Sequence, residues 1–312
     1  MAAQASIRPR DREGGVDLFG LTFRSGEIIP GLTPSRSAAP ADAIRIEFGA
    51  TPRHLADVQY EDETVQASDS EYLFSYPGVL RLYVEGDRRI VIERLEDCDP
   101  VRLWTIVFGV GSSITGFRRG FIPLHASSVL TPGGCIAMAG QSGAGKSTLA
   151  ASLVDRGFGL FADDLCLVQF GEDGTPLVGR GLPEVRLYDD AVAALDWTDI
   201  EPFAVQPNIN KSVFRRSSVA EPFAGLRRLY ALRFAGEDET PGIHRLDGVE
   251  AMQALVGCLR MRTGLLGVGP ARRTFERLAA ISERVEMFRF VRPRDHDSSA
   301  FWLDHLVEHF DA

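Results

Sequence analysis

The residues best suited to chemistry lie at positions 140–148, which read Gly-Gln-Ser-Gly-Ala-Gly-Lys-Ser-Thr. This segment matches the phosphate-binding loop pattern G-x-x-x-x-G-K-[ST], whose backbone N–H groups and lysine hold nucleotide phosphates. In that pattern Lys146 reaches the β- and γ-phosphates, and the Ser147 hydroxyl is a ligand of Mg²⁺. The sequence therefore predicts nucleotide contacts from eight residues: Gly140, Ser142, Gly143, Ala144, Gly145, Lys146, Ser147 and Thr148.

Lys146 is unusual in this chain because lysine is almost absent. The chain carries 34 lysine and arginine residues, and of these only Lys146 and Lys211 are lysines. Lysine is a compact point charge on a flexible side chain, whereas arginine presents a wide planar fork. A lysine kept at this position favours a true phosphate site over a glycine-rich turn without a ligand.

The elements around the loop are those that a phosphate site requires. A Pro-Gly-Gly turn at 132–134 precedes the apolar run 135–139, which predicts a buried strand. After the loop, Leu149, Leu153 and Val154 have helical spacing, and Gly157 is typical of a helix end. The order is thus strand, glycine loop, helix, and the helix N-terminus directs free N–H groups at the phosphates.

Two adjacent carboxylates, Asp163 and Asp164, follow the next expected strand at 160–162. This strand returns toward the end of the sheet where the loop lies. Neighbouring side chains diverge on an extended chain. One carboxylate can therefore hold the metal while the other accepts a proton from an incoming hydroxyl. The alternative is an ordinary acidic turn on the surface.

Two more candidates depend on weaker patterns. His125 stands in an apolar stretch before the strand of the loop, where a core histidine is the alternative to a catalytic one. Lys211, followed by Arg215 and Arg216, could contact the γ-phosphoryl group or the substrate, and a solvated basic loop is the alternative. Residues 210–213 read Asn-Lys-Ser-Val and lack the aspartate of a guanine-reading Asn-Lys-x-Asp, which argues against a GTPase.

Composition excludes several classes of protein. The chain of 312 residues is 45% apolar and 25% charged, as in ordinary soluble proteins, and its net charge of −9 argues against a nucleic-acid partner. Four separated cysteines favour reduced thiols and hence the cytoplasm. The N-terminus has no apolar signal-peptide core, and the longest apolar region, 103–117, is too short to span a membrane.

The order of patterns along the chain predicts three segments. Residues 1–40, rich in Pro, Ser, Ala and Gly, are expected to form a loose arm. Residues 41–118 contain short alternating runs, which predict a small β-rich subdomain, and end in an apolar helix over 103–117. Residues 119–312 mix strands with helical patterns near 248–259, 270–283 and 298–310, which predicts an α/β nucleotide-binding domain.

Three segments together resemble the HPr kinase/phosphorylase family and its relatives: Leu-His-Ala-Ser at 124–127, the loop at 140–148, and Arg-Gly-Phe-Gly-Leu-Phe-Ala-Asp-Asp at 156–164. The resemblance covers 121–170 well and 171–312 loosely. It implies an α/β fold related to phosphoenolpyruvate carboxykinase, with a mixed sheet and flanking helices. It also implies that Asp163 is the base for an accepting serine hydroxyl, that Asp164 is a metal ligand, and that His125 belongs to the active site.

The chain departs from that family at residues 178–183, Val-Gly-Arg-Gly-Leu-Pro, which lack the glutamate of the family's Glu-x-Arg-Gly-x-Gly signature. This argues against phosphorylase activity. Residues 118–127 and 183–187 are more similar to HPr kinase-like proteins found with lasso-peptide biosynthesis, which phosphorylate a serine of the precursor peptide. Arg180 and Arg186 lie in or beside these segments and are further candidates for phosphate or substrate contacts.

We therefore expect a kinase that uses ATP and Mg²⁺ to phosphorylate a serine of a peptide or protein, with Lys146, Asp163 and His125 as catalytic residues. The alternatives are a P-loop ATPase and a nucleotide-binding module without turnover. The hydrophobic strand ending in Asp-Glu that many such ATPases use is not evident later in the chain. The acceptor, the choice of ATP over GTP and the formation of a homo-oligomer stay open.

Overall fold

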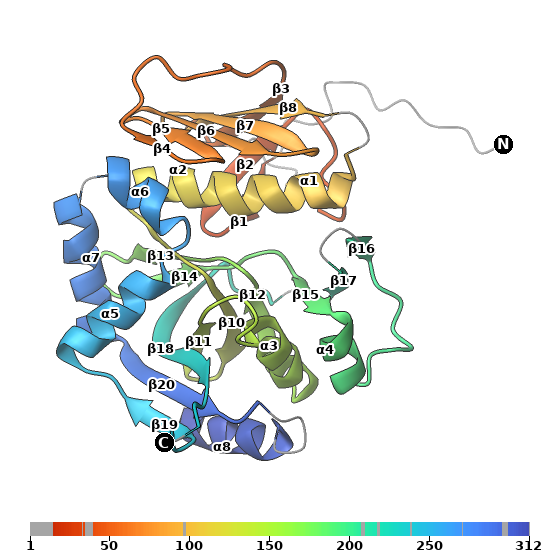
Figure 1. The fold of residues 1–312 in the computed structure, drawn as a ribbon, viewed down its shortest axis with the longest axis vertical. Coiled ribbons are helices and arrows are strands. Elements are labelled where there is room, and N and C mark those ends of the chain that lie inside the picture. Colours follow the sequence, from red (N-terminus) through yellow and green to blue (C-terminus); the bar gives the residue numbers. More distant parts are fainter. Residues whose placement is uncertain are drawn as a thin grey trace. The chain divides into compact units, whose positions relative to one another are not determined.

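The computed structural model describes residues 15–32, 34, 40–95, 98–206, 210–216, 219–237, 239–269, 271–294 and 299–311 (Figure 1). The chain divides into two compact units. The first comprises Met1–Arg119 and Thr263–Gly269, and the second comprises Gly120–Arg262 and Pro270–Ala312. The sequence had placed 263–269 in the catalytic domain, whereas this stretch packs with the first unit.

The first unit is built on an eight-stranded sheet with the strand order β1-β2-β3-β8-β7-β6-β5-β4. Its strands are β1 Val16–Leu18, β2 Leu21–Ser25, β3 Ile44–Phe48, β4 Tyr60–Glu61, β5 Val65–Ala67, β6 Glu71–Tyr76, β7 Leu80–Glu85 and β8 Arg89–Arg94. The prediction of a loose arm is wrong for the stretch that contains β1 and β2. There, inward-facing apolar residues such as Leu21 and Phe23 are buried and anchor the chain to the sheet.

A continuous helical segment packs on this sheet, and it confirms the helix expected over 103–117. It consists of α1 Pro100–Ile106, the π-helical turn η2 Val107–Gly111 and α2 Ser112–Arg118. Asp99 caps the start by accepting a hydrogen bond from the Arg102 amide. Phe108 packs edge-on against Phe23, with ring centroids 5.3 Å apart. The helix and the sheet therefore share one aromatic core.

Helix α6, Arg262–Val268, completes the first unit from a distant part of the sequence. A Cβ atom at Gly264 would collide with the Tyr72 hydroxyl, and one at Gly267 would lie 2.9 Å from the Tyr60 ring. The absence of side chains at these two glycines thus lets the helix approach both tyrosines closely. The sequence did not predict this short helix.

The second unit contains a nine-stranded mixed sheet in which β18 is central. Strand β18 pairs in parallel with β11 and β20 and antiparallel with β14. The strands are β9 Ile122–Leu124, β10 Ala126–Thr131, β11 Gly134–Ala139, β12 Gly159–Ala162, β13 Cys166–Phe170, β14 Pro176–Gly179, β18 Phe223–Phe234, β19 Gly242–Arg245 and β20 Glu286–Arg292. The unit is therefore mixed α/β, as expected.

Helices cover both faces of this sheet (Figure 1). On one face, α3 Lys146–Asp155 and α8 Ser299–Asp311 share a core with Tyr230, Phe290 and other buried residues of the sheet. The other face is covered by α5 Gly248–Cys258 and α7 Ala271–Arg284. The expected helices near 248–259, 270–283 and 298–310 are thus confirmed.

The direction of three strands gathers the predicted site at one sheet edge. Strands β11 and β12 both run antiparallel to β10, so they point the same way and their carboxyl ends share an edge. Strand β10 begins at that edge, because Ala126 pairs with Ala139. The loop after β11, the two aspartates after β12 and His125 before β10 are consequently neighbours.

A second, smaller sheet with the order β15-β17-β16 lies beside α3. It consists of β15 Glu184–Tyr188, β16 Ala204–Gln206 and β17 Lys211–Arg215, and it is accompanied by α4 Asp189–Ala194. Val185, Leu187 and Phe214 are buried in the same core as α3. One face of this small sheet is thereby fixed against the second unit.

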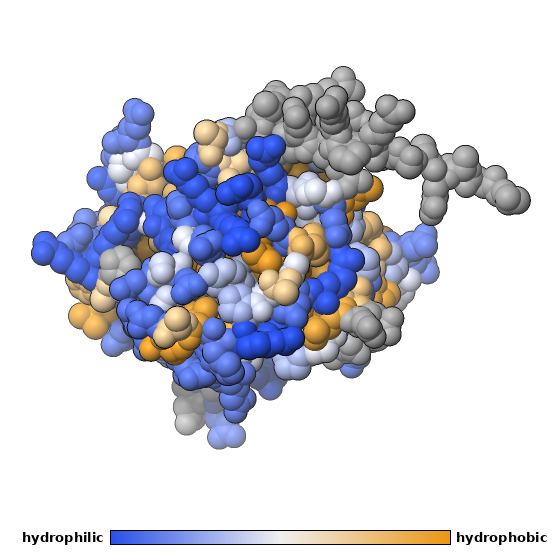
Figure 2. Space-filling view, turned by 90° about the horizontal axis from the view of Figure 1, so that it is seen from above, coloured by the Kyte–Doolittle hydropathy of each residue, from blue (hydrophilic) through white to orange (hydrophobic). Residues whose placement is uncertain are grey.

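The described helices show no membrane-crossing segment, since none of them is both long and apolar enough. The face of the molecule in Figure 2 is mainly hydrophilic, and its apolar residues lie in several patches among polar and charged ones.

Candidate phosphate and carboxylate site

The glycine loop between β11 and α3 is held in a shape that needs its glycines. Gly143 and Gly145 have φ values of +82° and +79°, in the left-handed region that glycine adopts without steric cost. A Cβ atom at Gly145 would collide with the Arg292 guanidinium, whereas one at Gly143 would meet no atom within 4 Å. Arg292 also donates a hydrogen bond of 2.6 Å to the Ala144 carbonyl. Strand β20 thus contacts the loop at Gly145, whereas space remains around Gly143.

Lys146 begins α3 and turns its side chain back onto the loop. Its Nζ atom donates to the carbonyls of Gly140 and Gln141 at 2.9 and 3.1 Å. Burial lowers the pKa of Lys146, while the charges of Asp164 and Asp163 act in the opposite direction. The ammonium group therefore interacts electrostatically with both carboxylates while it bonds to the loop carbonyls.

Asp163 is buried and accepts three hydrogen bonds. The Ser127 hydroxyl donates at 2.6 Å, the Ser147 hydroxyl at 2.8 Å and the Arg186 amide at 3.1 Å. Only 5% of the residue is exposed. A hydroxyl that donates to a carboxylate keeps both lone pairs for another partner. Asp163 therefore orients the oxygen of Ser147 that the loop pattern assigns to Mg²⁺.

Asp164 has different partners and a strained backbone. Its carboxylate lies 3.0 Å from the Arg260 guanidinium, 3.3 Å from His125 Nδ1 and 3.5 Å from the Arg186 guanidinium. Its φ of +70° is uncommon for a residue with a side chain, and such strain concentrates at functional sites. Burial opposes ionisation, but Arg260, Arg186 and His125 together hold the pKa of Asp164 well below its usual value. These partners therefore favour the ionised form of Asp164, whose side chain is 27% exposed.

His125 lies beside Asp164, so the structure brings it into the predicted cluster. Its Nδ1 atom is 3.1 Å from the Asp164 carbonyl oxygen, and its amide donates to the Cys258 carbonyl at 2.7 Å. That contact brings the end of α5 to the site and with it Arg260, whose amide donates to the Pro123 carbonyl at 2.9 Å. Sequence reasoning missed Arg260, because nothing in its local pattern separates it from the many other arginines.

Of the four candidate residues for phosphate or substrate contacts, all of which the structure describes, only Arg186 contacts the two aspartates, as described above. Arg180 instead donates to the Val219 and Ala220 carbonyls at 2.7 and 3.2 Å, so it fastens a neighbouring loop. Lys211 and Arg215 lie on β17 of the small sheet.

The contacts favour the reverse of the roles that the resemblance implied for the two aspartates. Asp163 touches Ser147, the expected metal ligand, whereas Asp164 faces arginine and histidine side chains and keeps some exposure. Within the described part of the chain, no three His, Cys, Asp or Glu residues form a metal-binding cluster. Mg²⁺ needs no such cage, because it commonly uses one or two carboxylates together with substrate phosphates. Ser147 and Asp163 fit a metal bound in that way.

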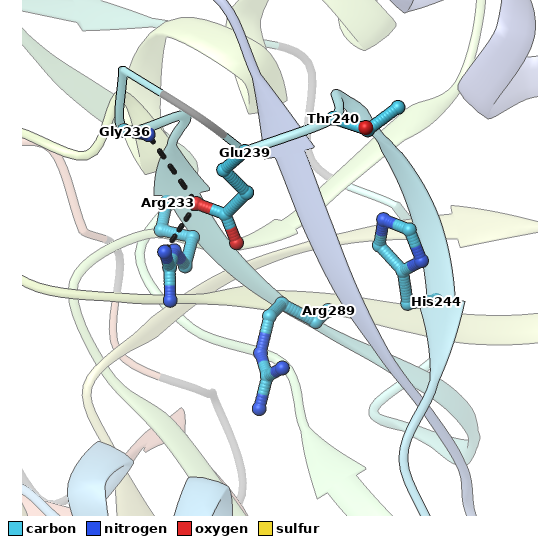
Figure 3. Close-up of a pocket in the computed structure, with 6 residues that line it drawn as sticks. All are labelled: Arg233, Gly236, Glu239, Thr240, His244 and Arg289. Atoms are coloured by element: carbon cyan, nitrogen blue, oxygen red, sulfur yellow. Dashed lines mark hydrogen bonds and ion pairs between the residues drawn. The ribbon is translucent and has the colours of Figure 1, made fainter.

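A separate cavity of about 590 Å³ opens beside β18, β19 and β20 (Figure 3). Arg233 and Glu239 form an ion pair on one side of it, and His244 and Arg289 stand on the other strands. The full lining consists of Arg233, Gly236, Glu239, Thr240, His244 and Arg289. These residues differ from those that contact Asp163 and Asp164, so the cavity is distinct from the carboxylate cluster.

No protein-family model matches the sequence, and no curated protein matches it. Among solved structures, the chain is similar to the Hpr(Ser) kinase/phosphatase from Coxiella burnetii. The two are 11% identical with a TM-score of 0.30, and the match covers 60% of this chain and 95% of that chain. At that TM-score the likeness carries no weight for function, and the chemistry follows from the residues of this chain.

Proposed function

We propose that this protein is a kinase that uses ATP and Mg²⁺ to phosphorylate a serine hydroxyl of a peptide or protein. The observation that carries the proposal is the difference in surroundings between two adjacent carboxylates at the end of β12. Asp163 accepts a hydrogen bond from the loop hydroxyl of Ser147, and Asp164 stands ionised beside it with partners of its own. A hydrolase could orient water with one such group, so the test must follow the phosphoryl group itself.

The proposed roles follow from these contacts. The loop glycines and Lys146 hold the phosphates, and Asp163 fixes the orientation of the Ser147 hydroxyl. Bound Mg²⁺ would offset negative charge on the phosphates. Asp164 accepts a hydrogen bond from the acceptor hydroxyl and then its proton, with His125 and Arg260 orienting the carboxylate. The low pKa of Asp164 is compatible with this role. In a loose transition state the orientation of the acceptor hydroxyl matters more than the basicity of the carboxylate.

The decisive experiment incubates the purified protein with γ-labelled ATP and serine peptides, and follows both labelled peptide and free phosphate. Label on serine is the expected result. Release of phosphate with no labelled peptide would instead identify the ATPase alternative, and nucleotide binding with neither product would identify a binding module. Precursor peptides of the lasso class are the first acceptors to test, because residues 118–127 and 183–187 resemble their kinases.

Two variants separate the roles of the aspartates. Asp164→Asn should abolish transfer, by at least ~10²-fold, while nucleotide affinity stays near that of the wild type. Asp163→Asn should weaken the Mg²⁺-dependent part of nucleotide binding as well as transfer. If Asp163→Asn lost transfer alone and Asp164→Asn lost metal dependence, Asp163 would be the base, as the resemblance implied.

A further inference from the structure

The small sheet beside the site has one face whose residues do not belong to the apolar cluster that it shares with α3. Directly paired residues of antiparallel strands share a face. Tyr188 pairs with Lys211, Arg186 with Val213, and Glu184 with Arg215. Strand β16 adds Gln206, which pairs with Lys211. We call this the site-side face, and it carries the following residues: Glu184, Arg186, Tyr188, Ala204, Gln206, Lys211, Val213 and Arg215.

The site-side face is basic in an acidic chain. It holds three cationic side chains and one carboxylate, Glu184, which lies 4.0 Å from the Arg215 guanidinium, whereas the whole chain has a net charge of −9. Lys211 Nζ lies 4.5 Å from the centroid of the Tyr188 ring and forms no ion pair with the described residues. Arg215 stacks on Phe203, 3.5 Å from the ring centroid. Cations supported by aromatic rings therefore line this face.

The same face is continuous with the carboxylate cluster. The Arg186 amide donates to Asp163 at 3.1 Å, and its guanidinium lies 3.5 Å from Asp164. Val213 pairs with Arg186, and Lys211 is the next residue of β17 that lies on the same face. Its charge reaches the phosphate loop, since it contributes to the lowered pKa of Lys146. A molecule that presents a hydroxyl to Asp164 would extend across this face.

Gln206 provides an independent sign that the face binds a ligand. Only 3% of the residue is exposed, yet neither the side-chain amide nitrogen nor the amide oxygen has a hydrogen-bond partner among the described residues. A buried amide without partners destabilises a fold, and each such group calls for an explanation. A peptide backbone supplies both a donor and an acceptor, which is what this amide lacks.

We propose that the site-side face binds the acceptor as a peptide that carries Asp or Glu next to its serine. Lys211 pairs with the acidic side chain, the Tyr188 and Phe203 rings support the chain of the peptide, and the Gln206 amide bonds its backbone. This inference rests on the proposed kinase function for the identity of the acceptor. The binding itself does not depend on catalysis.

The test measures binding of fluorescein-labelled serine peptide pools to the full chain by anisotropy, without nucleotide. The pools differ only in having acidic, neutral or basic neighbours of serine. The wild type should bind the acidic pool at least about fivefold more tightly than the neutral pool, which is about 1 kcal/mol. Lys211→Gln should remove this preference, Lys211→Arg should keep it, and Lys211→Glu should shift it to the basic pool.

Two further variants control for a general loss of positive charge and for a loss of stability. Arg272→Gln removes an exposed cation on α7 and should leave the preference intact. Gln206→Leu removes the unpaired amide and should weaken peptide binding while the midpoint of thermal unfolding stays the same or rises. Equal binding of the three pools by the wild type would overturn the proposal. So would an acidic preference that survives Lys211→Gln or is lost in Arg272→Gln.

Label transfer to the same pools distinguishes this proposal from the kinase proposal. Binding that prefers the acidic pool, without transfer, would support the proposed peptide-binding face and contradict the kinase proposal. Transfer with no acidic preference at any peptide concentration would support the kinase proposal and contradict the proposed face.

Discussion

At the scale of single residues, Asp163 and Asp164 show how two consecutive residues can have different surroundings. Asp163 is enclosed by hydroxyl and amide donors, and Asp164 by cationic side chains. The left-handed backbone of Asp164 turns its carboxylate away from the direction that a continued strand would impose. The two groups therefore respond to different perturbations, and each can be tested alone.

Asp164 should make stability depend on pH. Its pKa is lower in the folded chain than in the unfolded chain, so its stabilising contribution is complete above the unfolded value of about 4 and is lost as the pH falls toward the folded value. Asp164→Asn should lower the free energy of unfolding at pH 7 by roughly 1–3 kcal/mol, because Arg260 and Arg186 lose a partner. The free energy of unfolding, measured by urea titration, should also fall less steeply between pH 7 and pH 3 in this variant than in the wild type.

The matched control for that measurement is Asp304→Asn, which removes a surface carboxylate paired with Arg156. It should change stability at pH 7 by less than about 1 kcal/mol. If the free energy of unfolding of Asp164→Asn fell as steeply with acid as that of the wild type, Asp164 would not have the lowered pKa that we assign to it.

Arg260 should set the pH range of the reaction. Arg260→Gln removes the largest influence that lowers the pKa of Asp164, so the pKa should rise. Because the proposed role needs the ionised carboxylate, the acidic limb of the transfer rate should move to higher pH. Arg260→Lys keeps the charge and should shift the limb less. A uniform loss of rate with no shift would show that Arg260 acts on the substrate instead.

At the scale of elements, the loop between β11 and α3 offers a matched pair of glycines. Gly145→Ala and Gly143→Ala both place a side chain in the left-handed region, at roughly 1–2 kcal/mol each. Only the change at Gly145 also pushes a methyl group into Arg292. We therefore expect Gly145→Ala to lose more stability and more nucleotide affinity than Gly143→Ala, measured by urea unfolding and nucleotide titration. Equal losses would show that the contact from β20 is unimportant.

Local sequence patterns predicted the elements that depend on local physics. The strand at 135–139, the glycine loop and the helix from Lys146 follow from turn chemistry, apolar runs and helical spacing. Strands β1 and β2 were missed because a Pro- and Gly-rich composition concealed a short alternating pattern. Arg260 was missed for another reason: the Leu124–Leu259 bridge that brings it to His125 is a long-range pairing, and no local pattern encodes it.

At the scale of the whole molecule, ligand binding should be visible as stability. A ligand that binds only the folded chain raises the free energy of unfolding by about 2.7 kcal/mol at a hundredfold excess over its Kd. Mg·ADP should therefore raise the midpoint of thermal unfolding, and Lys146→Ala should abolish that rise. ADP with a metal chelator should give a smaller rise than Mg·ADP. A full rise in Lys146→Ala would place the nucleotide elsewhere, for example in the cavity of Figure 3.

Helix α6 has a consequence for how this protein can be divided. Because Thr263–Gly269 belongs to the first unit, the backbone passes from one unit to the other three times rather than once. A fragment that ends at Arg119 would leave Tyr60 and Tyr72 without the glycines that pack on them, and the complementary fragment would carry an orphaned helix. Neither unit is a contiguous gene segment. Modular exchange of the β-rich unit would thus require a cut after Arg119 and two more on either side of Thr263–Gly269. The first of these two follows closely after Arg260, the residue that contacts Asp164.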